Sequence, residues 1–335
     1  MSTEKKPNIY DVAKLAEVSH QTVSRVLNGH ASIRPETRER VEAAMKSLGY
    51  RPNRAARALV TSKNNMLGFL VSDNGLYGPA GMLYAMEREA RNAGYFAISI
   101  AIRYDDPESW REGIEHLKNL GVEGIAVIAL KSEAMEKVLT AFPRTPMVAI
   151  DTEDVPQVRA VGIDNRSGAV LATQHLIDLG HRSILHIAGP EYSAEARARR
   201  EGYEQTMKQA GLSAQVLQGD WSADTGFKLG VDLNLELAGV TGIFAANDHL
   251  CLGLLKALRM RTIDVPGRVS LIGFDDVPES TYFVPPLTTV RQDFNRLGES
   301  AMEILLGELS GQSVRTKVSV QPELVVREST ARLES

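Results

Sequence analysis

Residues 8–29 read NIYDVAKLAEVSHQTVSRVLNG, and this stretch predicts two short helices joined by a tight turn. Asn8 can cap the first helix, with Asp11 three residues later as its capping partner. Ser19 can cap the second helix, and Asn28 with Gly29 forms a stop that tolerates positive φ. Apolar residues recur at helical spacing in both helices, at Ile9, Val12, Ala13, Ala16, Val23, Val26 and Leu27.

The second of these helices carries a polar outer face. Its members are His20, Gln21, Ser24 and Arg25. Long side chains with hydrogen-bonding tips, at the start of a helix whose N–H groups can meet a phosphate, are what a recognition helix needs in the DNA major groove. The alternative is an ordinary helical hairpin with a solvated face, because short motifs often match by chance.

Charge is distributed unevenly over the 335 residues. Residues 1–65 hold 12 Lys and Arg against 6 Asp and Glu, whereas the remainder holds 26 basic and 36 acidic residues. A basic head on an acidic body suits a protein whose first segment alone meets a polyanion. A chance excess of lysine and arginine explains this less well, because the basic segment coincides with the two-helix motif.

A third helix and a short linker follow the motif. Pro35 fits the first position of a helix that Gly49 ends, which completes a minimal three-helix bundle. Residues 53–65, NRAARALVTSKNN, have too little apolar content to hold a helix alone, so we expect a flexible linker off DNA. On DNA the segment could enter the minor groove, with Leu59 wedged between bases and Arg54 close to phosphates.

From Met66 onward, near-continuous apolar strands alternate with amphipathic helices, which indicates parallel sheets covered on both faces. Roughly ten such units exceed one ordinary open sheet, so we predict an α/β fold with two similar lobes; an eight-unit barrel is the alternative. The predicted domains are a helix-turn-helix head (1–52), a hinge helix and linker (53–65) and a core (66–335), with a first lobe of about 66–162 plus 292–320 and a second of about 163–290 plus 321–332.

Polar residues follow several predicted strands of the core, where ligands of open α/β sheets bind. They are Asp151, Asn247, Asp275 and Gln292. Carboxylates and amides can bind vicinal hydroxyls, while an indole such as that of Trp221 can cover the C–H face of a sugar. This combination fits a neutral, hydroxyl-rich ligand. The structural alternatives are core packing for Trp221 and helix capping for Asp248 and Asp293.

Catalytic and membrane signals are missing from the sequence. It has no Gly-rich phosphate loop, G-x-S-x-G elbow or H-E-x-x-H motif, so we expect no enzyme, cofactor or metal. His175, His181 and His186 lack metal-ligand spacing and are expected to be surface or capping residues. Cys251 should be a buried, unpaired thiol. Without a signal peptide or a transmembrane run, we expect a cytoplasmic protein and disfavour a sugar-transport binding protein.

Two stretches resemble the DNA-binding head and hinge of the lac repressor/galactose repressor family. They are residues 8–29 and residues 34–59, RPETRERVEAAMKSLGYRPNRAARAL. The core resembles the same family through HLIDLGHRSILHIAGP, FAANDHLCLGLLKAL, VSLIGFDD and PPLTTVRQDF, so the likeness runs from about Asn8 to Arg327. It implies a helix-turn-helix head followed by a two-lobed core like that of periplasmic binding proteins.

The resemblance also implies roles for individual residues. Those for DNA are major-groove readers (His20, Gln21, Arg25), residues nearer the backbone (Thr22, Ser24) and a further DNA-binding residue (Asn28). Residues 53–61 would form a hinge helix on the operator, with Asn53, Arg54, Ala56 and Leu59 as its DNA-binding residues and Leu59 entering the minor groove. Those for a sugar are hydroxyl-binding residues (Asp151, Arg199, Asn247, Asp275), a stacking ring (Trp221), an apolar lining (Leu76, Pro79, Phe294) and a further candidate (Gln292).

We therefore expect a homodimeric repressor that binds a pseudo-palindromic operator and is released allosterically by a small sugar. His20 replaces a tyrosine of the family pattern, so the operator need not be the same. The chain reaches Ser335 without a heptad-bearing tail, which predicts a dimer rather than a tetramer. The sugar-contacting set favours a β-galactoside. A glucoside or cellobiose-type sugar, and a ligand that acts as co-repressor, are the alternatives.

Overall fold

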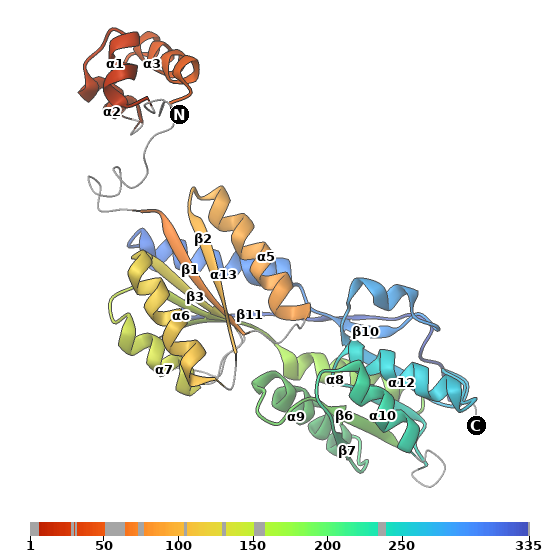
Figure 1. Cartoon of the computed structure of the whole chain (residues 1–335). Coiled ribbons are helices and arrows are strands. Elements are labelled where there is room, and N and C mark those ends of the chain that lie inside the picture. The colour runs from red at the N-terminus through yellow and green to blue at the C-terminus, as the bar shows by residue number, and fades with distance from the viewer. Residues whose placement is uncertain are drawn as a thin grey trace, which may run out of the picture. The chain divides into compact units, whose positions relative to one another are not determined.

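The computed structural model describes residues 7–27, 30, 32–50, 64–72, 77–103, 106–128, 132–150, 158–233 and 239–333. The chain divides into two compact units, Met1–Asn64 and Asn65–Ser335. The first unit is helical, and the second holds two sheets covered by helices (Figure 1).

The first unit holds the helices α1 (Ile9–Leu15), α2 (His20–Leu27) and α3 (Pro35–Leu48), and side-chain caps start the first two. The Asn8 side chain accepts from the N–H groups of Tyr10 and Asp11, and the Asp11 carboxylate accepts from Asn8 N at 2.8 Å. The Ser19 hydroxyl accepts from Thr22 N at 3.1 Å. Both predicted caps are confirmed.

An apolar core joins these three helices. Val12, Val23 and Val41 each contribute a fully buried side chain, one from each helix. Between α1 and α2 the chain turns at Glu17, whose φ is 54°, and Gly49 ends α3 with a φ of 61°. The predicted helix-turn-helix bundle is therefore confirmed for the described residues of the head.

A six-stranded parallel sheet forms the first lobe of the second unit, in the order β11-β5-β4-β3-β1-β2. Its strands are β1 (Met66–Ser72), β2 (Phe96–Ile102), β3 (Gly124–Ile128), β4 (Met147–Ile150), β5 (Arg159–Ile163) and β11 (Lys317–Val320). Two helices, α5 (Tyr77–Asn92) and α13 (Phe294–Leu309), share one apolar core with the sheet. Another two, α6 (Pro107–Leu120) and α7 (Ser132–Ala141), share the other core.

A second six-stranded sheet forms the second lobe, in the order β12-β10-β9-β8-β6-β7, and only its β10–β12 pair is antiparallel. Its strands are β6 (Ile184–Ala188), β7 (Gln215–Gln218), β8 (Gly242–Ala245), β9 (Ser270–Asp275), β10 (Thr288–Arg291) and β12 (Glu323–Val325). Helices α8 (Asn165–Asp178) and α9 (Ala194–Gln209) pack on one face, whereas α10 (Ala223–Asp232) and α12 (Asp248–Met260) pack on the other.

The chain crosses between the two lobes three times. The first crossover leads from β5 to α8 at Asp164, the second from β10 to α13 at Gln292, and the third from β11 to β12 at Gln321. Two open sheets exclude the barrel alternative, and the predicted two-lobed α/β fold is confirmed. Strand β5 was not predicted, because its five residues, RAVGI, are only partly apolar.

The capping prediction for Asp248 is wrong, while Asp293 caps α13 as expected by accepting from Arg296 N. Asp248 does not cap α12, since Asn247 does so and Asp248 is fully buried. Its carboxylate instead accepts from Val277 N at 2.9 Å and from the Thr289 hydroxyl.

The histidines were also misread as surface or capping residues. His186 is fully buried, with its ring stacked on Phe244. His181 is 2% exposed and hydrogen-bonds Thr241 and Ser270, and only His175 is half-buried. The thiol of Cys251 is buried and unpaired, as predicted. Within the described ranges, every helix is too short or too polar to span a bilayer.

Candidate functional site

The outer face of α2 presents three exposed polar side chains. His20, Gln21 and Arg25 are exposed, whereas Thr22 and Ser24 are half-buried. Val23 and Val26 lie on the opposite face of α2 and are buried in the head core, so the polar side chains point away from that core. The face is therefore accessible to a flat or grooved partner such as duplex DNA.

Tyr10 of α1 extends this face, and sequence reasoning missed it. Its ring centroid lies 5.1 Å from that of His20, and its side chain is 64% exposed. An exposed aromatic ring beside a polar helix face is a signal that the sequence already carried. The Tyr10 ring packs against one side of the His20 imidazole.

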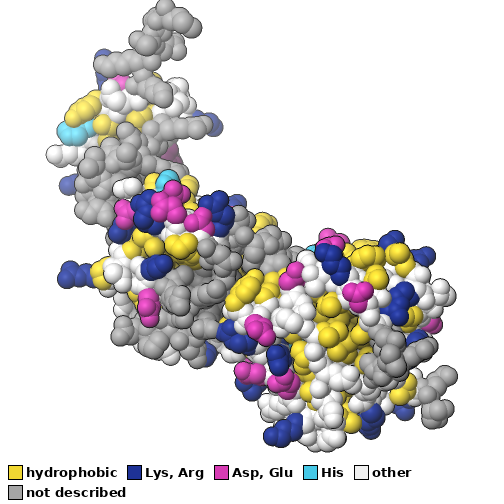
Figure 2. Space-filling view, turned by 60° about the horizontal axis from the view of Figure 1, so that its bottom comes forward, with side chains coloured by type: hydrophobic (Ala, Val, Ile, Leu, Met, Phe, Trp, Pro, Cys, Tyr) yellow, Lys and Arg dark blue, Asp and Glu magenta, His cyan; other side chains and the backbone are white. Residues whose placement is uncertain are grey.

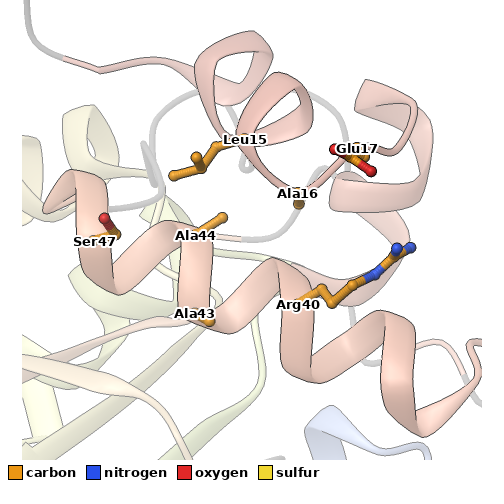
Figure 3. Close-up of a pocket in the computed structure, with 7 residues that line it drawn as sticks. All are labelled: Leu15, Ala16, Glu17, Arg40, Ala43, Ala44 and Ser47. Atoms are coloured by element: carbon orange, nitrogen blue, oxygen red, sulfur yellow. The ribbon is translucent and has the colours of Figure 1, made fainter.

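A separate open pocket of about 340 Å³ lies elsewhere on the head (Figure 3). It is lined by the end of α1, the following turn and α3, through Leu15, Ala16, Glu17, Arg40, Ala43, Ala44 and Ser47. Because no residue of α2 lines it, the pocket is not part of the polar outer face of that helix.

Several predicted site residues lie outside the described residues. They are Asn28, Asn53, Arg54, Ala56 and Leu59 of the DNA set and Leu76 and Asp151 of the ligand set. Their roles stay predictions from the resemblance.

The second lobe gathers the remaining polar residues around a buried arginine. Arg199, on α9, has a side chain that is only 5% exposed, and its Nη1 lies 3.5 Å from Oδ1 of Asp275 at the end of β9. The same guanidinium donates to the carbonyl of Ala246, just after β8. Its carbon lies 3.8 Å from the centroid of the Phe274 ring and 5.4 Å from that of Trp221.

Asp275 is held at an unusual backbone angle, with φ at 116°. Gln292, which follows β10, donates from Nε2 to its Oδ1 at 2.6 Å. Burial raises the pKa of Asp275 to about 6, against the opposing effect of the Arg199 charge and of His249. We conclude that the carboxylate is held by its neighbours while part of it faces outward, since the side chain remains 12% exposed.

Trp221 and Asn247 are fixed to each other. Asn247 donates from Nδ2 to the Trp221 carbonyl at 3.0 Å, while its Oδ1 caps α12 by accepting from Leu250 N at 2.9 Å. The indole lies against Gly189, where a Cβ atom would be 2.5 Å from the ring. Trp221 is only partly buried against the apolar core of the second lobe, so part of its ring remains accessible.

The two apolar candidates that the structure describes, Pro79 and Phe294, belong to the first lobe. Phe294, 7% exposed, starts α13 and packs beside Gly78 and Gly81 of α5. Pro79 lies on the same stretch of α5 and is half-buried. Pro79 and Phe294 therefore lie on α5 and α13 of the first lobe, whereas the polar residues around Arg199 lie on the second lobe.

Asp276 faces a different set of partners from its neighbour. Its carboxylate binds Arg327 at 2.6 Å and Arg291 at 2.7 Å. Burial tends to raise its pKa, but the hydrogen bonds from these two arginines outweigh burial and lower it. The adjacent carboxylates thus belong to two different ion pairs, Asp275 with Arg199 and Asp276 with Arg291 and Arg327. Among the described residues, no group of three or more His, Cys, Asp and Glu could hold a metal.

Comparison with known proteins relates both units to one family. Residues 8–53 match the profile described as bacterial regulatory proteins, lacI family, and residues 173–330 match the periplasmic binding protein-like domain. The lactose operon repressor of Escherichia coli (strain K12) is 32% identical over 328 residues, covering 97% of this chain and 91% of that protein. The repressor PurR of Haemophilus influenzae (strain PittGG) is 33% identical over 331 residues, covering 96% and 98%.

Solved structures give the same relation. The lac repressor dimer bound to operator and the anti-inducer ONPF aligns with a TM-score of 0.88 at 31% identity, covering 98% of this chain and 100% of that one. A complex of the regulator CelR with cellobiose aligns with a TM-score of 0.73 at 30% identity, covering 96% and 99%.

The raised pKa of Asp275 predicts a specific pH dependence of stability. Its folded value of about 6 lies above the usual unfolded value of about 3.9, so its proton stabilises the fold below about pH 4 and that stabilisation is lost as the pH rises through 6. Asp275→Asn should remove this loss, which amounts to about 2 kcal/mol between pH 4 and pH 7. Urea unfolding of variant and parent across this range measures it.

Asp276→Asn is the matched control. Its parent carboxyl has a lowered pKa, so it contributes stability above the unfolded pKa that is lost as the pH falls. The two variants should therefore differ from the parent with opposite pH dependences. Parallel curves for Asp275→Asn and the parent would contradict the assignment.

Proposed function

The chain belongs to the lacI family of bacterial regulatory proteins and is a DNA-binding transcriptional repressor, and we propose that a small neutral saccharide releases it from its operator. The family consists of DNA-binding regulators rather than enzymes. The observation that carries the saccharide proposal is the buried Arg199–Asp275 pair beside the Trp221 ring.

Charge balance supports a neutral ligand. The guanidinium of Arg199 and the carboxylate of Asp275 offset each other, so an anionic ligand would meet no surplus positive charge from this pair. Asp275 and Gln292 offer hydrogen-bonding groups for hydroxyls, and the accessible part of Trp221 offers an apolar face for a sugar ring.

We infer that the effector is a β-galactoside or a related saccharide. Likeness to the lactose operon repressor along nearly the whole chain supports this, as does a structure of the lac repressor bound to ONPG, which is 32% identical with a TM-score of 0.86. The cellobiose complex of CelR supports a glucoside as the alternative. The likeness to PurR supports a second alternative, in which the ligand acts as co-repressor.

On the DNA side, we propose that His20, Gln21 and Arg25 read base edges in the major groove. Their exposure on one helix face supports this role. Thr22, Ser24 and Asn28 would lie nearer the DNA backbone. The hinge residues Asn53, Arg54, Ala56 and Leu59 would fold against the minor groove.

Exposed apolar side chains support a homodimer. Tyr282 is 83% exposed, Val284 is 71% exposed and Leu252 is 43% exposed, all in the second lobe. Hydrophobic side chains gather between scattered charges on the face of that lobe seen in Figure 2. A large exposed apolar surface commonly marks a protein interface, and the lac repressor is itself described as a dimer. Two heads would then face two half-sites of a pseudo-palindromic operator.

Arg25→Ala should lower operator discrimination by about 1–3 kcal/mol if the side chain reads a guanine edge. The operator would first be selected from random duplexes, and fluorescence anisotropy would compare it with point variants. Arg40→Ala is the matched control, because it removes the same charge from an exposed site on α3. A loss of discrimination equal in both variants would remove Arg25 from the reading set.

Asp275→Ala should leave operator affinity unchanged and abolish release by saccharide, because the variant loses the carboxylate that would accept hydrogen bonds from the ligand hydroxyls. Anisotropy titrations with methyl β-galactoside and cellobiose would measure release. Linkage requires that the operator weaken binding of the inducer by the same factor by which the inducer weakens operator binding. Tighter operator binding on addition of ligand would support the co-repressor alternative. Full release of the Asp275→Ala variant by saccharide would contradict the assignment of Asp275 to the ligand site.

Tyr282→Asp should convert the dimer to a monomer, because a charge would replace the most exposed of the aromatic and aliphatic side chains of the proposed interface. Sedimentation velocity over a concentration series measures the assembly. Leu171→Asp, at a residue that is 40% exposed on α8, is the control expected to remain dimeric. A Tyr282→Asp protein that sediments as a dimer would sink this interface.

A further inference from the structure

Two of the three crossovers between the lobes place a side chain against the ion pair of Arg199 and Asp275. Gln292, on the second crossover, donates to Oδ1 of Asp275 at 2.6 Å. Asn165, directly after the first crossover, accepts with Oδ1 from Nε of Arg199 at 2.8 Å. The ion pair formed by Arg199 and Asp275 is therefore held from both crossovers.

The first and third crossovers are joined to each other. The Asp164 N–H donates to the carbonyl of Val320, the last residue of β11, at 3.0 Å. Nε2 of Gln321 lies 3.5 Å from Oδ2 of Asp164. A displacement of one of these two crossovers therefore acts on the other.

The Asn165 amide is not needed to start helix α8. Asp164 is the N-cap and accepts from Ser167 N at 2.9 Å, so the helix start is already satisfied. Asn165 is only 6% exposed, and its Nδ2 donates to the carbonyl of Ile163, the last residue of β5, at 3.3 Å. Its amide thus bridges the end of a first-lobe strand and the guanidinium of Arg199.

We propose that Asn165 is a positioning residue that couples Arg199 to the first crossover. A change in the angle between the lobes that moves Ile163 then moves the guanidinium. A ligand that binds at Arg199 acts on the crossover in the reverse direction, as linkage requires. This inference rests on the proposed function only in taking Arg199 and Asp275 as the ligand site.

Three variants separate positioning from ordinary buried packing. Asn165→Ala removes the oxygen that accepts from Arg199. Asn165→Asp keeps an oxygen acceptor there, but it replaces the amide donor with a second oxygen and adds a negative charge next to the guanidinium. Thr173→Val is the matched control on the same helix. Thr173 is fully buried, and its hydroxyl donates to the Ala169 carbonyl at 2.7 Å, away from the crossover.

The first readout needs no ligand. The chain has two tryptophans, so a Trp110→Phe background isolates Trp221, whose ring centroid lies 5.4 Å from the Arg199 guanidinium. Asn165→Ala should shift Trp221 emission and increase its quenching by acrylamide, because the cation is no longer held over the ring. Asn165→Asp and Thr173→Val should match the background. Unchanged emission in Asn165→Ala, or equal changes in Asn165→Ala and Thr173→Val, would overturn the proposal.

The second readout is the coupling factor, the ratio of saccharide dissociation constants with and without operator. Methyl β-galactoside and cellobiose are the probes. Asn165→Ala should reduce this ratio toward 1 from a parent value typical of about 5- to 150-fold, while Thr173→Val retains it. A parent-like ratio in Asn165→Ala would also overturn the proposal. Failure of the parent to bind either saccharide would remove the saccharide proposal, and the emission readout would still decide the role of Asn165.

Discussion

The buried charge of Arg199 is the constraint on which the second lobe depends. An uncompensated cation at a side chain only 5% exposed would cost several kcal/mol, so its surroundings must supply matching groups. The lobe supplies a carboxylate at the end of β9, a carbonyl after β8, an amide at the start of α8 and an aromatic face at Phe274. Phe274 and Asp275 are neighbours on β9, whereas the carbonyl after β8 and the amide at the start of α8 come from other parts of the chain, so these groups meet only when the lobe folds.

The parallel arrangement of the sheets makes this convergence possible. Strands β8 and β9 are neighbours and parallel, so their carboxyl ends meet at one edge, where Ala246 and Asp275 both lie. Strand β10 adds Gln292 at the same edge because it is parallel to β9. The second crossover leaves from this edge, and the first places Asn165 beside Arg199, which is why contacts within the proposed ligand site and contacts between lobes share residues.

Local rules predicted much of this protein. Helix caps at Asn8 and Ser19 depend on residues three positions away, and the positions of Asp275 and Gln292 followed from the rule for strand ends. The failures were non-local. Asp248 is buried because Thr289, far along the chain, satisfies it, and His181 is buried by Thr241 and Ser270. Asn165 was missed for the same reason, because only the fold brings it to Arg199.

The head has an apolar core made from its own helices, with Val12, Val23 and Val41 buried against one another. None of the residues on the outer face of α2 takes part in that core. Substitutions at these surface positions can therefore change the DNA sequence that is recognised without disturbing the packing of the bundle. Selection can also retune the response to small molecules in a separate unit. Duplicated copies of such a gene are free to diverge in target and in signal independently.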